Sequence, residues 1–483
     1  MKSSPTLKQK AISATIWSTI DTFSKQGLNF IITLILARLL TPTDYGTVGL
    51  LAIFLGVAGV FINSGFSFAL IQRQEISDIE LSSVFYFNLF MALLFSGILA
   101  LAAPLIASFY NMPVLIPLTQ VMAAALFISA LGSIQATMLT KSLDFRTQCI
   151  ISIASVVVSG IIGVFMAWNN YGVWSLAISF LASSCITTIL LWVLHSWRPR
   201  LIFSASSVSS LFRFGSFMMA SSLIDTLYTR MNTLVIGKFY SAEDLGYYSR
   251  ADATQQLPAG ILSGVIGRVS FPLFSAASQN TALLRAGLHK EIIQTMMFNI
   301  PVMLGIAVTA RPFILVLFGD QWVPCVPYLQ ILCLGGILWP LHVLNLNVLM
   351  AQGHSNLLFR IEVIKKSMGI ILLGIACLIG IMAIAWSTVI TGIIGLFINA
   401  HYSGLFLSYG VIRQTMDLLP YLAAGLVMSF CVWSTAVILP FHAPILLLLI
   451  QIVTGVLVYA FICYIFRLSA FTESRYAVYS PLG

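Results

Sequence analysis

The chain has 483 residues, of which 59% are hydrophobic and only 8% are charged, and its formal net charge is +9. A soluble protein carries about 25% charged residues, so a chain this apolar cannot keep its surface in water. Apolar runs of about 20 residues, long enough to cross a bilayer, recur along the whole sequence. The composition predicts an all-α polytopic membrane protein and excludes a separate soluble catalytic domain. The positive charge then reports membrane orientation rather than nucleic-acid binding.

Hydropathy predicts 14 membrane-spanning helices in chain order. They lie near residues 11–36, 46–71, 82–103, 114–138, 147–168, 172–194, 211–237, 247–274, 291–313, 323–350, 361–380, 382–403, 418–439 and 444–466. This order predicts an N-terminal six-helix lobe over 1–200, a C-terminal six-helix lobe over 201–410, and an extra helix pair with a short cytoplasmic tail over 411–483. We expect the two lobes to surround a central cavity.

Basic residues are distributed unevenly between the predicted connections. The odd-to-even connections hold Arg38, Lys238, Arg250 and Arg311, whereas 17 basic residues, Lys365 among them, lie at the termini and in the even-to-odd connections. An excess of Lys and Arg marks the cytoplasmic side. Both termini are therefore predicted to be cytoplasmic, which requires an even number of spans.

The sequence also repeats itself at an offset of 200 residues. LARLLTPTDYG at 36–46 matches IGKFYSAEDLG at 236–246, and MLTKSLDFR, which ends at Arg146, is similar to MAQGHSNLLFR, which ends at Arg360. Because each repeat has six spans, both halves enter the membrane from the same side. The predicted repeat is parallel, with a pseudo-two-fold axis along the membrane normal.

Charged and amide side chains inside the predicted spans are the candidate functional residues. A charge at mid-membrane costs about 2.5–3.5 kcal/mol, so each needs water or a partner. On the first span the polar residues recur at spacings of three and four, which places them on one helical face, and the seventh and eighth spans are similar. The candidates for substrate binding are Lys25, Asn29, Arg230, Asn232, Gln255, Gln256 and Arg268, and those for coupling or gating are Asp21, Asp225 and Asp252.

Two pairings of Lys25 are open from the sequence. Asp21 lies four residues earlier on the same helical face, where the two residues could form a structural ion pair. The 200-residue offset instead places Lys25 at the position equivalent to Asp225, which predicts a salt bridge across the pathway in one access state. Asp225 and Arg230 lie about 140° apart around a helix and do not face each other. His342 in the tenth span is interpreted as structural rather than as a proton carrier.

The sequence contains no motif for covalent chemistry or metal binding. There is no Gly-rich phosphate loop, no H-E-x-x-H and no nucleophile elbow, and the seven cysteines show no C-x-x-C spacing. The acidic run of Glu75, Asp78 and Glu80 is interpreted as a solvated loop. We therefore expect a protein that is not an enzyme and that has no cofactor and no metal site.

Several stretches, in this order, resemble one family of transporters. They are LARLLTPTDYG at 36–46, FALIQR at 68–73, NTLVIGKFYSAEDLGYYSRADATQQLP at 232–258, VSFPLFS at 269–275 and LFGDQW at 317–322. Together they are similar to the polysaccharide transporter family, the Wzx-type lipopolysaccharide and colanic-acid exporters, within the multidrug/oligosaccharidyl-lipid/polysaccharide flippase superfamily. The resemblance implies a two-lobed bundle of twelve core spans plus two more. Asn232 stands where that family often has an acidic residue, so the role of that carboxylate is not carried over.

The resemblance implies a flippase that moves an undecaprenyl-pyrophosphate-linked oligosaccharide repeat unit across the bacterial inner membrane for surface polysaccharide biosynthesis. Alternating access, proton or sodium coupling and a glycan polymerase partner are further expectations, and no nucleic acid is expected. Lys25, Arg230 and Arg268 are the cations available to a pyrophosphate. Two alternatives stay open. One is a cation-coupled multidrug exporter of the same superfamily that uses Asp21 or Asp225, and the other is a membrane scaffold for glycan assembly that does not transport.

Overall fold

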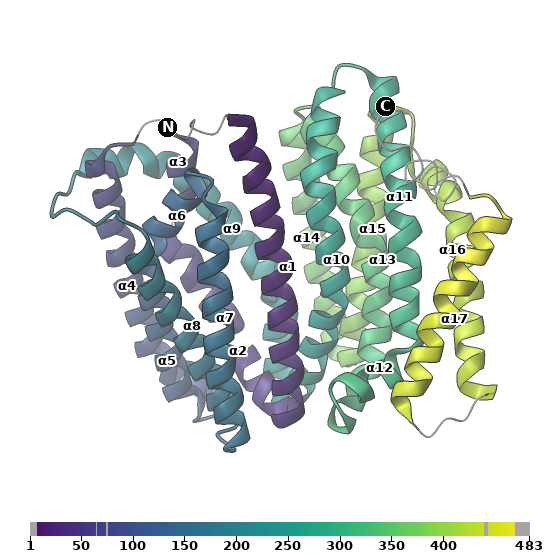
Figure 1. Ribbon diagram of the computed structural model, residues 1–483, viewed down its shortest axis with the longest axis horizontal. Helices are drawn as coiled ribbons and strands as arrows, with labels where there is room; N and C mark the ends of the chain where they lie inside the picture. The colour runs from purple at the N-terminus through teal and green to yellow at the C-terminus, as the bar shows by residue number, and fades with distance from the viewer. Residues whose placement is uncertain (1–6, 64, 74–75, 439–442, 469–483) are drawn as a thin grey trace. The chain divides into compact units, whose positions relative to one another are not determined.

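The computed structural model describes residues 7–63, 65–73, 76–438 and 443–468, and within them it describes no side chain at 7–12, 14–15, 68, 210–211, 213–214, 263–269, 271–272 and 355. The described chain is helical (Figure 1). By packing it divides into two compact units, Met1–Gly246 and Tyr247–Gly483. The elements are α1 (Leu7–Leu39), α2 (Pro42–Asn63), α3 (Phe66–Gln72), α4 (Asp78–Tyr110), α5 (Leu115–Ala130), α6 (Ser133–Lys141), α7 (Phe145–Trp168), α8 (Val173–Leu194), α9 (Ala205–Phe239), α10 (Ala242–Ala276), α11 (Thr281–Val308), α12 (Ala310–Leu317), the 3₁₀ helix η1 (Asp320–Cys325), α13 (Val326–Ala351), α14 (Ser355–Ile379), α15 (Ile381–Leu407), α16 (Val411–Ile438) and α17 (Pro444–Ile465).

Nine helices within the described residues are long and apolar enough to cross a membrane. A tenth candidate span is the bent pair α5 and α6, whose axes differ by 45°. Four further helices, α1, α9, α10 and α14, are 25 to 35 residues long, but each contains charged residues, such as Lys25 in α1 and Lys365 in α14. The prediction of an all-α polytopic membrane protein is confirmed. The number of 14 spans stays a prediction, because these four helices are not among those that are apolar enough and sufficiently free of charge to be identified as spans.

Helices of the first unit pack through small and hydroxyl side chains. α1 packs against α7, and α7 packs against α8. Ser155 of α7 donates a hydrogen bond to the Ser183 carbonyl of α8 at 3.0 Å, and Thr187 donates to Ser155 at 2.8 Å. A Cβ added at Gly163 would lie 3.0 Å from the Ser179 Cβ. Close approach and interhelical hydrogen bonds are the interactions that hold helices together in lipid, where the hydrophobic effect between them is weak.

In the second unit α13 contacts both α11 and α15. Asn299 of α11 is fully buried and donates to the carbonyls of Gly336 and Ile337 in α13, at 3.1 and 3.0 Å. These bonds cross between two helices in the middle of their lengths. They fix the register of α11 against α13.

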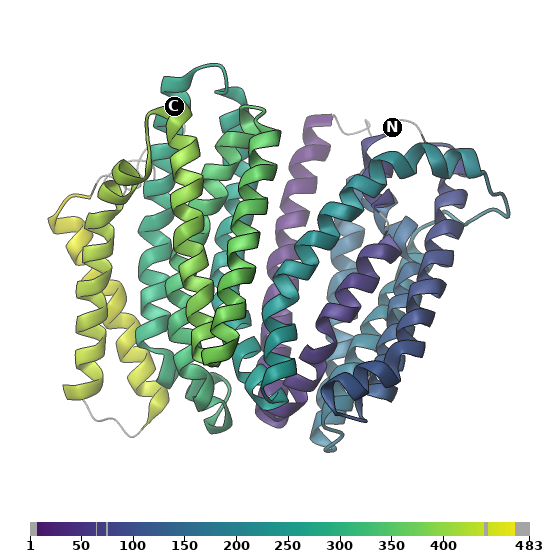
Figure 2. The ribbon, with the colours of Figure 1, turned by 180° about the vertical axis from the view of Figure 1, so that it is seen from behind.

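The last helix pair, α16 and α17, packs side by side and is attached to α11, as both ribbon views show (Figures 1 and 2). Gln414 of α16 donates to Asn345 Oδ1 of α13 at 3.0 Å, and Ser403 of α15 donates to the same oxygen. Tyr459 of α17 donates to the Met297 carbonyl at 3.0 Å. Buried hydrogen bonds therefore join this pair to the rest of the second unit.

The helix boundaries repeat at the offset found in the sequence. α1 ends at Leu39 and α2 begins at Pro42, whereas α9 ends at Phe239 and α10 begins at Ala242. All four positions are related by 200 residues. The sequence repeat is therefore also a repeat of local structure at this point of the fold.

Each of these two helix starts is closed by the same reciprocal pair of hydrogen bonds. Thr41 N donates to Asp44 Oδ2 at 2.9 Å, and Asp44 N donates to Thr41 Oγ1 at 3.3 Å. Ser241 N donates to Asp244 Oδ2 at 3.3 Å, and Asp244 N donates to Ser241 Oγ at 3.0 Å. Both are capping boxes, in which the first residue and the fourth satisfy each other's backbone N–H groups.

The compact units do not coincide with the regions predicted from the repeat. α9 packs against α2, α3 and α4, so the first unit extends to Gly246 (Figure 2). The predicted boundaries at residues 200 and 410 divide the chain by repeat rather than by packing, and they stay a prediction.

Candidate functional site

The candidate residues of α1 differ in exposure. Asp21 is half-buried and its Oδ1 is buried without a hydrogen-bond partner. One turn later Lys25 is exposed, and so is Asn29. Within the described part of the chain no ion pair closer than 4.0 Å joins Lys25 to Asp21. The local pair, one of the two sequence alternatives, is absent from this structure.

The candidates on α9 are mostly on its exposed surface. Asp225 and Arg230 are exposed, and Asn232 is half-buried. Arg230 has no hydrogen bond or ion pair with any described residue. Lys25 and Asp225 also form no ion pair in the described structure. The guanidinium of Arg230 and the ammonium of Lys25 are thus available to a ligand.

Lys25 and Asp225 lie at equal depth along equivalent helices. Each precedes the end of its helix, Leu39 or Phe239, by 14 residues, which is about 21 Å along the helix axis. The hydrocarbon core of a bilayer is about 30 Å thick. If the helix ends lie at the interface, both charges fall within the core, where an exposed charge needs water or a counter-charge.

The candidates on α10 belong to the second unit. Gln256 is exposed and donates to Asp252 Oδ2 at 2.8 Å. Gln255 is buried against α13, where a Cβ added at Gly336 would lie 3.0 Å from the Gln255 Cδ. The structure brings Asp252 and Gln256 together and separates both from Gln255. The Arg268 side chain lies outside the described residues.

Arg250 is a buried charge that the sequence analysis assigned to an outer connection. It lies inside α10 with 6% of its surface exposed. Its guanidinium carbon lies 5.1 Å from the ring centre of Phe318 and 5.0 Å from that of Trp322. Both rings belong to the LFGDQW stretch, so two of the stretches that carry the family resemblance contact each other. The sequence shows Arg250 and, much later, the aromatic residues Phe318 and Trp322. It does not show that these residues are in contact.

A second, partly buried set of polar groups joins α13, α14 and α15. The Lys365 side chain is 13% exposed and forms an ion pair with Glu362 one turn earlier. Asn399 of α15 is fully buried, with its Nδ2 3.1 Å from His342 Nδ1 of α13. A Cβ added at Gly395 would lie 3.1 Å from His342 Cε1 and 3.3 Å from Lys365 Cδ. The sequence analysis counted Lys365 as a loop residue, and the i,i+3 spacing from Glu362 was the signal for a helical pair.

Asp417 of α16 connects two further elements of the second unit. It accepts a hydrogen bond from the Tyr409 hydroxyl at 2.7 Å and lies 3.3 Å from His289 Nε2 of α11. Burial, and then the hydrogen bond to Asp417, raise the pKa of Tyr409, which lies in the connection between α15 and α16. Tyr409 therefore stays a hydrogen-bond donor through the physiological range.

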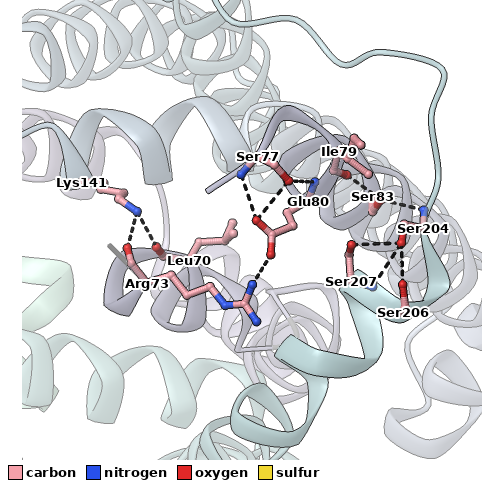
Figure 3. A network of polar contacts seen from close by, with 10 residues as sticks. All are labelled: Leu70, Arg73, Ser77, Ile79, Glu80, Ser83, Lys141, Ser204, Ser206 and Ser207. Atoms are coloured by element: carbon pink, nitrogen blue, oxygen red, sulfur yellow. Dashed lines mark hydrogen bonds and ion pairs between the residues drawn. The ribbon is translucent and has the colours of Figure 1, made fainter. Parts of the chain in front are cut away.

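Glu80, part of the run interpreted as a solvated loop, is the centre of a polar network (Figure 3). Ser77 N donates to Glu80 Oε2 at 2.9 Å and Glu80 N donates to Ser77 Oγ at 3.3 Å, a capping box at the start of α4. Arg73 forms an ion pair with the second carboxylate oxygen, and Lys141 of α6 donates to the Arg73 carbonyl. The solvated interpretation is wrong for Glu80, because its side chain is only 15% exposed. Glu75 lies outside the described residues.

The connection from α8 to α9 is tied to the same end of α4. Arg200 N donates to Ser82 Oγ at 3.0 Å. Ser204 N donates to Ser83 Oγ at 2.9 Å, as Figure 3 shows. The Arg200 guanidinium also lies 3.1 Å from Asp78. This connection is therefore held in place along its length.

His195 begins this connection and acts as an acceptor. Its Nδ1 accepts a hydrogen bond from Trp197 N at 3.1 Å. Burial and, next, the positive charge of Arg198 lower the pKa of His195, and Asp144 acts in the opposite direction. The neutral imidazole is therefore the form that fits this site.

The class of this protein is a multi-pass membrane protein, because it combines long apolar helices with helices that carry exposed charges. The chain belongs to the polysaccharide biosynthesis protein family, whose model matches residues 35–327. The family predicted from the sequence is thereby confirmed.

Three named relatives cover most of the chain. The lipopolysaccharide biosynthesis protein WzxC of Escherichia coli (strain K12) is 29% identical over 365 residues, which cover 74% of this chain and 73% of WzxC. The teichuronic acid biosynthesis protein TuaB of Bacillus subtilis is 27% identical and covers 74% of each chain. The succinoglycan biosynthesis transport protein ExoT of Rhizobium meliloti is 28% identical and covers 70% of this chain and 68% of ExoT.

Two solved structures have the same fold. The lipid II flippase MurJ in its inward closed conformation gives a TM-score of 0.77 at 20% identity, and covers 94% of this chain and 98% of its own. An inward-facing multidrug resistance transporter of the MATE family of the MOP superfamily gives 0.62 at 16% identity, and covers 82% of this chain and 98% of its own. At these identities the similarity shows the fold alone.

Proposed function

We propose that this protein is a flippase that moves an undecaprenyl-pyrophosphate-linked oligosaccharide repeat unit across the bacterial inner membrane by alternating access, for surface polysaccharide biosynthesis. The names of WzxC, TuaB and ExoT support the pathway, and the name of ExoT supports transport. MurJ, which has the same fold, is named a lipid II flippase. The observation on the molecule that carries the proposal is the exposure of two cations, Lys25 and Arg230, on α1 and α9.

The charged pyrophosphate is the part of such a substrate that costs the most free energy to move into the hydrocarbon core of a bilayer. Arginine and lysine form short, charge-assisted hydrogen bonds to phosphate oxygens, and the arginine fork can form two at once. Arg230 has no described partner that competes for this role. We assign Arg230 and Lys25 to the pyrophosphate, with Arg268 as a third cation.

The amide side chains can form hydrogen bonds with the sugar part of the substrate. An amide side chain both donates and accepts hydrogen bonds, as a sugar hydroxyl does. Asn29 and Gln256 are exposed and Asn232 is half-buried, so we assign these three to the oligosaccharide. Gln255 is buried against α13, and we assign it to positioning α10 rather than to substrate contact.

Three carboxylates are the candidates for coupling or gating. Asp21 is the first, because its buried Oδ1 has no hydrogen-bond partner and a bound proton or sodium ion would satisfy it. Asp225 and Asp252 are the second and third, and Asp252 already accepts a hydrogen bond from Gln256. A glycan polymerase that takes up the flipped repeat unit is the partner we expect. The proposal contains no covalent step, and the names of ExoT and MurJ are those of a transport protein and a flippase rather than of enzymes.

A cation-coupled multidrug exporter is the alternative that the MATE fold keeps open. It would use Asp21 or Asp225 to exchange a cation for a drug. The exposed Lys25 and Arg230 oppose it, because they repel a cationic drug. A scaffold that does not transport would leave both exposed cations without a role.

For orientation, we propose that both termini lie in the cytoplasm. The support is the excess of basic residues on the connections predicted to face inward. Alkaline phosphatase and green fluorescent protein fused after Gly483 report opposite sides of the membrane. We expect a fluorescent and phosphatase-negative fusion, and the reverse result would mean an odd number of spans.

The test of the function is deletion of the gene followed by mass spectrometry of lipid-linked glycans. We expect the surface glycan to be lost and its undecaprenyl-pyrophosphate-linked repeat unit to accumulate. The wild-type gene should reverse both changes. If the lipid-linked unit does not accumulate while drug sensitivity rises, the multidrug alternative is favoured instead. Loss of the glycan without accumulation or drug sensitivity would point to the scaffold.

A further inference from the structure

The connection from α8 to α9 exposes three consecutive apolar side chains. Leu201 is 94% exposed, Ile202 43% and Phe203 56%. They lie within residues 195–204, which are not helical, and both ribbon views show this connection at the outer edge of the first unit (Figures 1 and 2). Because this segment is not a membrane-spanning helix, these side chains form an apolar surface of a different kind from the lipid-facing sides of the spans.

Backbone groups of this connection are bonded within the protein. Arg200 N and Ser204 N donate to hydroxyls of α4, and Ile202 N donates to the Arg200 carbonyl at 2.7 Å. Pro199 has no N–H group to satisfy. Irregular backbone can approach hydrocarbon only where the protein itself satisfies its polar groups. These bonds therefore lower the cost of placing the connection at the edge of a bilayer.

Two tryptophans fasten the other side of the connection to the first unit. Trp192 Nε1 donates to the Leu131 carbonyl at 2.8 Å. The ring centres of Trp192 and Trp197 lie 6.4 and 6.1 Å from that of Phe85 in α4. Tryptophan is enriched where a protein crosses the boundary between bilayer and water. One side of the connection is thus packed on the protein, and the other side presents the apolar residues.

Arg198 holds a fixed positive charge beside this apolar surface. Its guanidinium donates to the carbonyls of Trp192, His195 and Trp197, and its central carbon lies 5.4 Å from the Trp192 ring centre. These partners are all neutral, and Arg198 forms no ion pair with a described carboxylate. A guanidinium has five N–H donors, so two remain for an anion. The charge is held in position and is not neutralised.

Arg200 is a second cation on the same surface. Its side chain is 66% exposed, and its ion pair with Asp78 is also exposed, so the pair contributes little and leaves donors free. Arginine forms charge-assisted hydrogen bonds to phosphate oxygens, whereas the three apolar side chains need an apolar partner. A phospholipid with an anionic headgroup offers both parts, and inorganic phosphate offers only the first.

We propose that the connection from α8 to α9 is a membrane anchor that recognises anionic phospholipid. Arg198 and Arg200 bind the headgroup phosphates, and Leu201–Phe203 enter the adjoining acyl chains. Because Ser204 caps α9 directly after these residues, the anchor holds the start of α9 at the bilayer surface. In the proposed orientation this is the surface of the cytoplasmic leaflet. The inference does not depend on the flippase function.

The first test measures the depth of the apolar side chains by electron paramagnetic resonance. The seven native cysteines are replaced, and a spin label is attached at Leu201→Cys. The matched control is Ser196→Cys, an exposed polar position of the same connection. In vesicles of phosphatidylcholine and phosphatidylglycerol, collision with oxygen relative to a water-soluble nickel chelate should be several-fold higher at 201 than at 196. Equal ratios at the two positions would overturn the proposal.

The second test measures the choice of headgroup. A fluorescent label at Leu201→Cys is reconstituted in phosphatidylcholine vesicles that contain the same fraction of either brominated phosphatidylglycerol or brominated phosphatidylcholine. One arginine near an anionic lipid corresponds to an enrichment of about fivefold, so brominated phosphatidylglycerol should quench the label more strongly, by about that factor. Equal quenching by the two lipids, or no quenching by either, would overturn the proposal.

Charge substitutions complete the second test. Arg198→Gln with Arg200→Gln should abolish the preference for phosphatidylglycerol, whereas Arg198→Lys with Arg200→Lys should keep it. Arg200→Gln alone breaks only an exposed ion pair, so it should lower the preference in part and serves where the double glutamine variant does not fold. The matched control is Arg360→Gln with Arg413→Gln, at two exposed arginines of the second unit. A preference that survives the glutamine substitutions, or that the control loses equally, would contradict the anchor.

Discussion

Charged side chains within the helices are used in opposite ways in the two units. In the first unit Lys25 and Arg230 are exposed and have no described ion-pair partner. In the second unit Arg250 is buried against two aromatic rings, and Lys365 is largely buried beside Glu362. Lysine and arginine side chains therefore differ between these positions. At some positions other groups of the protein already interact with the charge, and at others they do not.

This difference separates charges that support the fold from charges that are open to a ligand. A buried charge that is removed leaves its partners desolvated and destabilises the protein. Removal of an exposed charge leaves the fold intact and removes an interaction with whatever occupies the site. Substitution of Arg250 or Lys365 should therefore act on stability, and substitution of Lys25 or Arg230 on transport.

The largest expected effect is that of Arg250→Met. Loss of the two desolvated cation–π contacts should lower the free energy of unfolding by about 2 kcal/mol. Thermal unfolding in detergent can be followed with a thiol-reactive dye, since Cys325 and Cys333 are buried in the same unit. Arg311→Met, at an exposed arginine, is the matched control and should unfold like the wild type. Equal unfolding of both variants would remove the distinction between buried and exposed charges.

The next effect is on transport. Arg230→Gln should lower export about tenfold, equivalent to about 1.4 kcal/mol of binding, because glutamine keeps much of the stem but cannot neutralise a pyrophosphate. Protein abundance and thermal unfolding should stay at wild-type values. Arg311→Gln controls for loss of an exposed positive charge. Normal export by Arg230→Gln would show that exposure in the first unit does not mark a binding residue.

A double-mutant cycle sharpens the comparison within the first unit. Lys25 and Asp225 form no ion pair in this structure, so a bridge between them belongs to another access state. Lys25→Gln and Asp225→Asn, read as transport, should then couple by about 1 kcal/mol, above the roughly 0.5 kcal/mol within which independent sites add. The charge swap Lys25→Asp with Asp225→Lys should restore part of the loss. Additive losses without rescue would leave Lys25 unconnected to Asp225.

The smallest effect is a pH dependence in the connection from α8 to α9. The lowered pKa of His195 means that the folded state favours the neutral imidazole, which accepts from Trp197 N. This stabilisation is fully present above the ordinary pKa of 6.5 and is lost as the pH falls through the lower folded value. One neutral hydrogen bond contributes about 0.5 kcal/mol.

Hydrogen exchange over residues 196–204 at pH 7.5 and 5.5 measures this effect. The connection should lose protection at pH 5.5 once intrinsic rates are taken into account. His195→Asn keeps an acceptor near the Nδ1 position and does not titrate, so its protection should not change between the two pH values. The same loss in both proteins would assign the effect to another group.

The sequence predicted the features that depend on local periodicity. The repeat of T-P-T-D and S-A-E-D was found, but hydropathy placed the spans at 46 and 247, whereas the capped helices begin at Pro42 and Ala242. The polar residues of α1 and α9 were also found, because a charged residue within an apolar segment can be recognised from the sequence without knowledge of its partner. Family and fold class were also within reach of the sequence.

Features that depend on partners distant in the chain were missed. Arg250 meets Phe318 and Trp322 about 70 residues away, and a count of basic residues per connection cannot show that such a side chain is buried. Glu80 was assigned to solvent although its capping partner Ser77 lies only three residues earlier, and its ion pair with Arg73 joins the end of α3 to the start of α4. The contact of Gly46 with Ala242 lies between two motifs that the sequence related but could not place together.

The central claim, movement of a lipid-linked oligosaccharide between leaflets, is tested most directly with purified protein in vesicles. A fluorescent undecaprenyl-pyrophosphate-linked oligosaccharide is incorporated into both leaflets of phosphatidylethanolamine and phosphatidylglycerol vesicles, and a membrane-impermeant glycosidase cleaves the sugar on the outer side. With the wild-type protein, cleavage should proceed past the outer-leaflet half of the substrate, and with Arg230→Gln about tenfold more slowly. Cleavage that stops at the outer-leaflet half with folded wild-type protein, as in protein-free vesicles, would contradict the account.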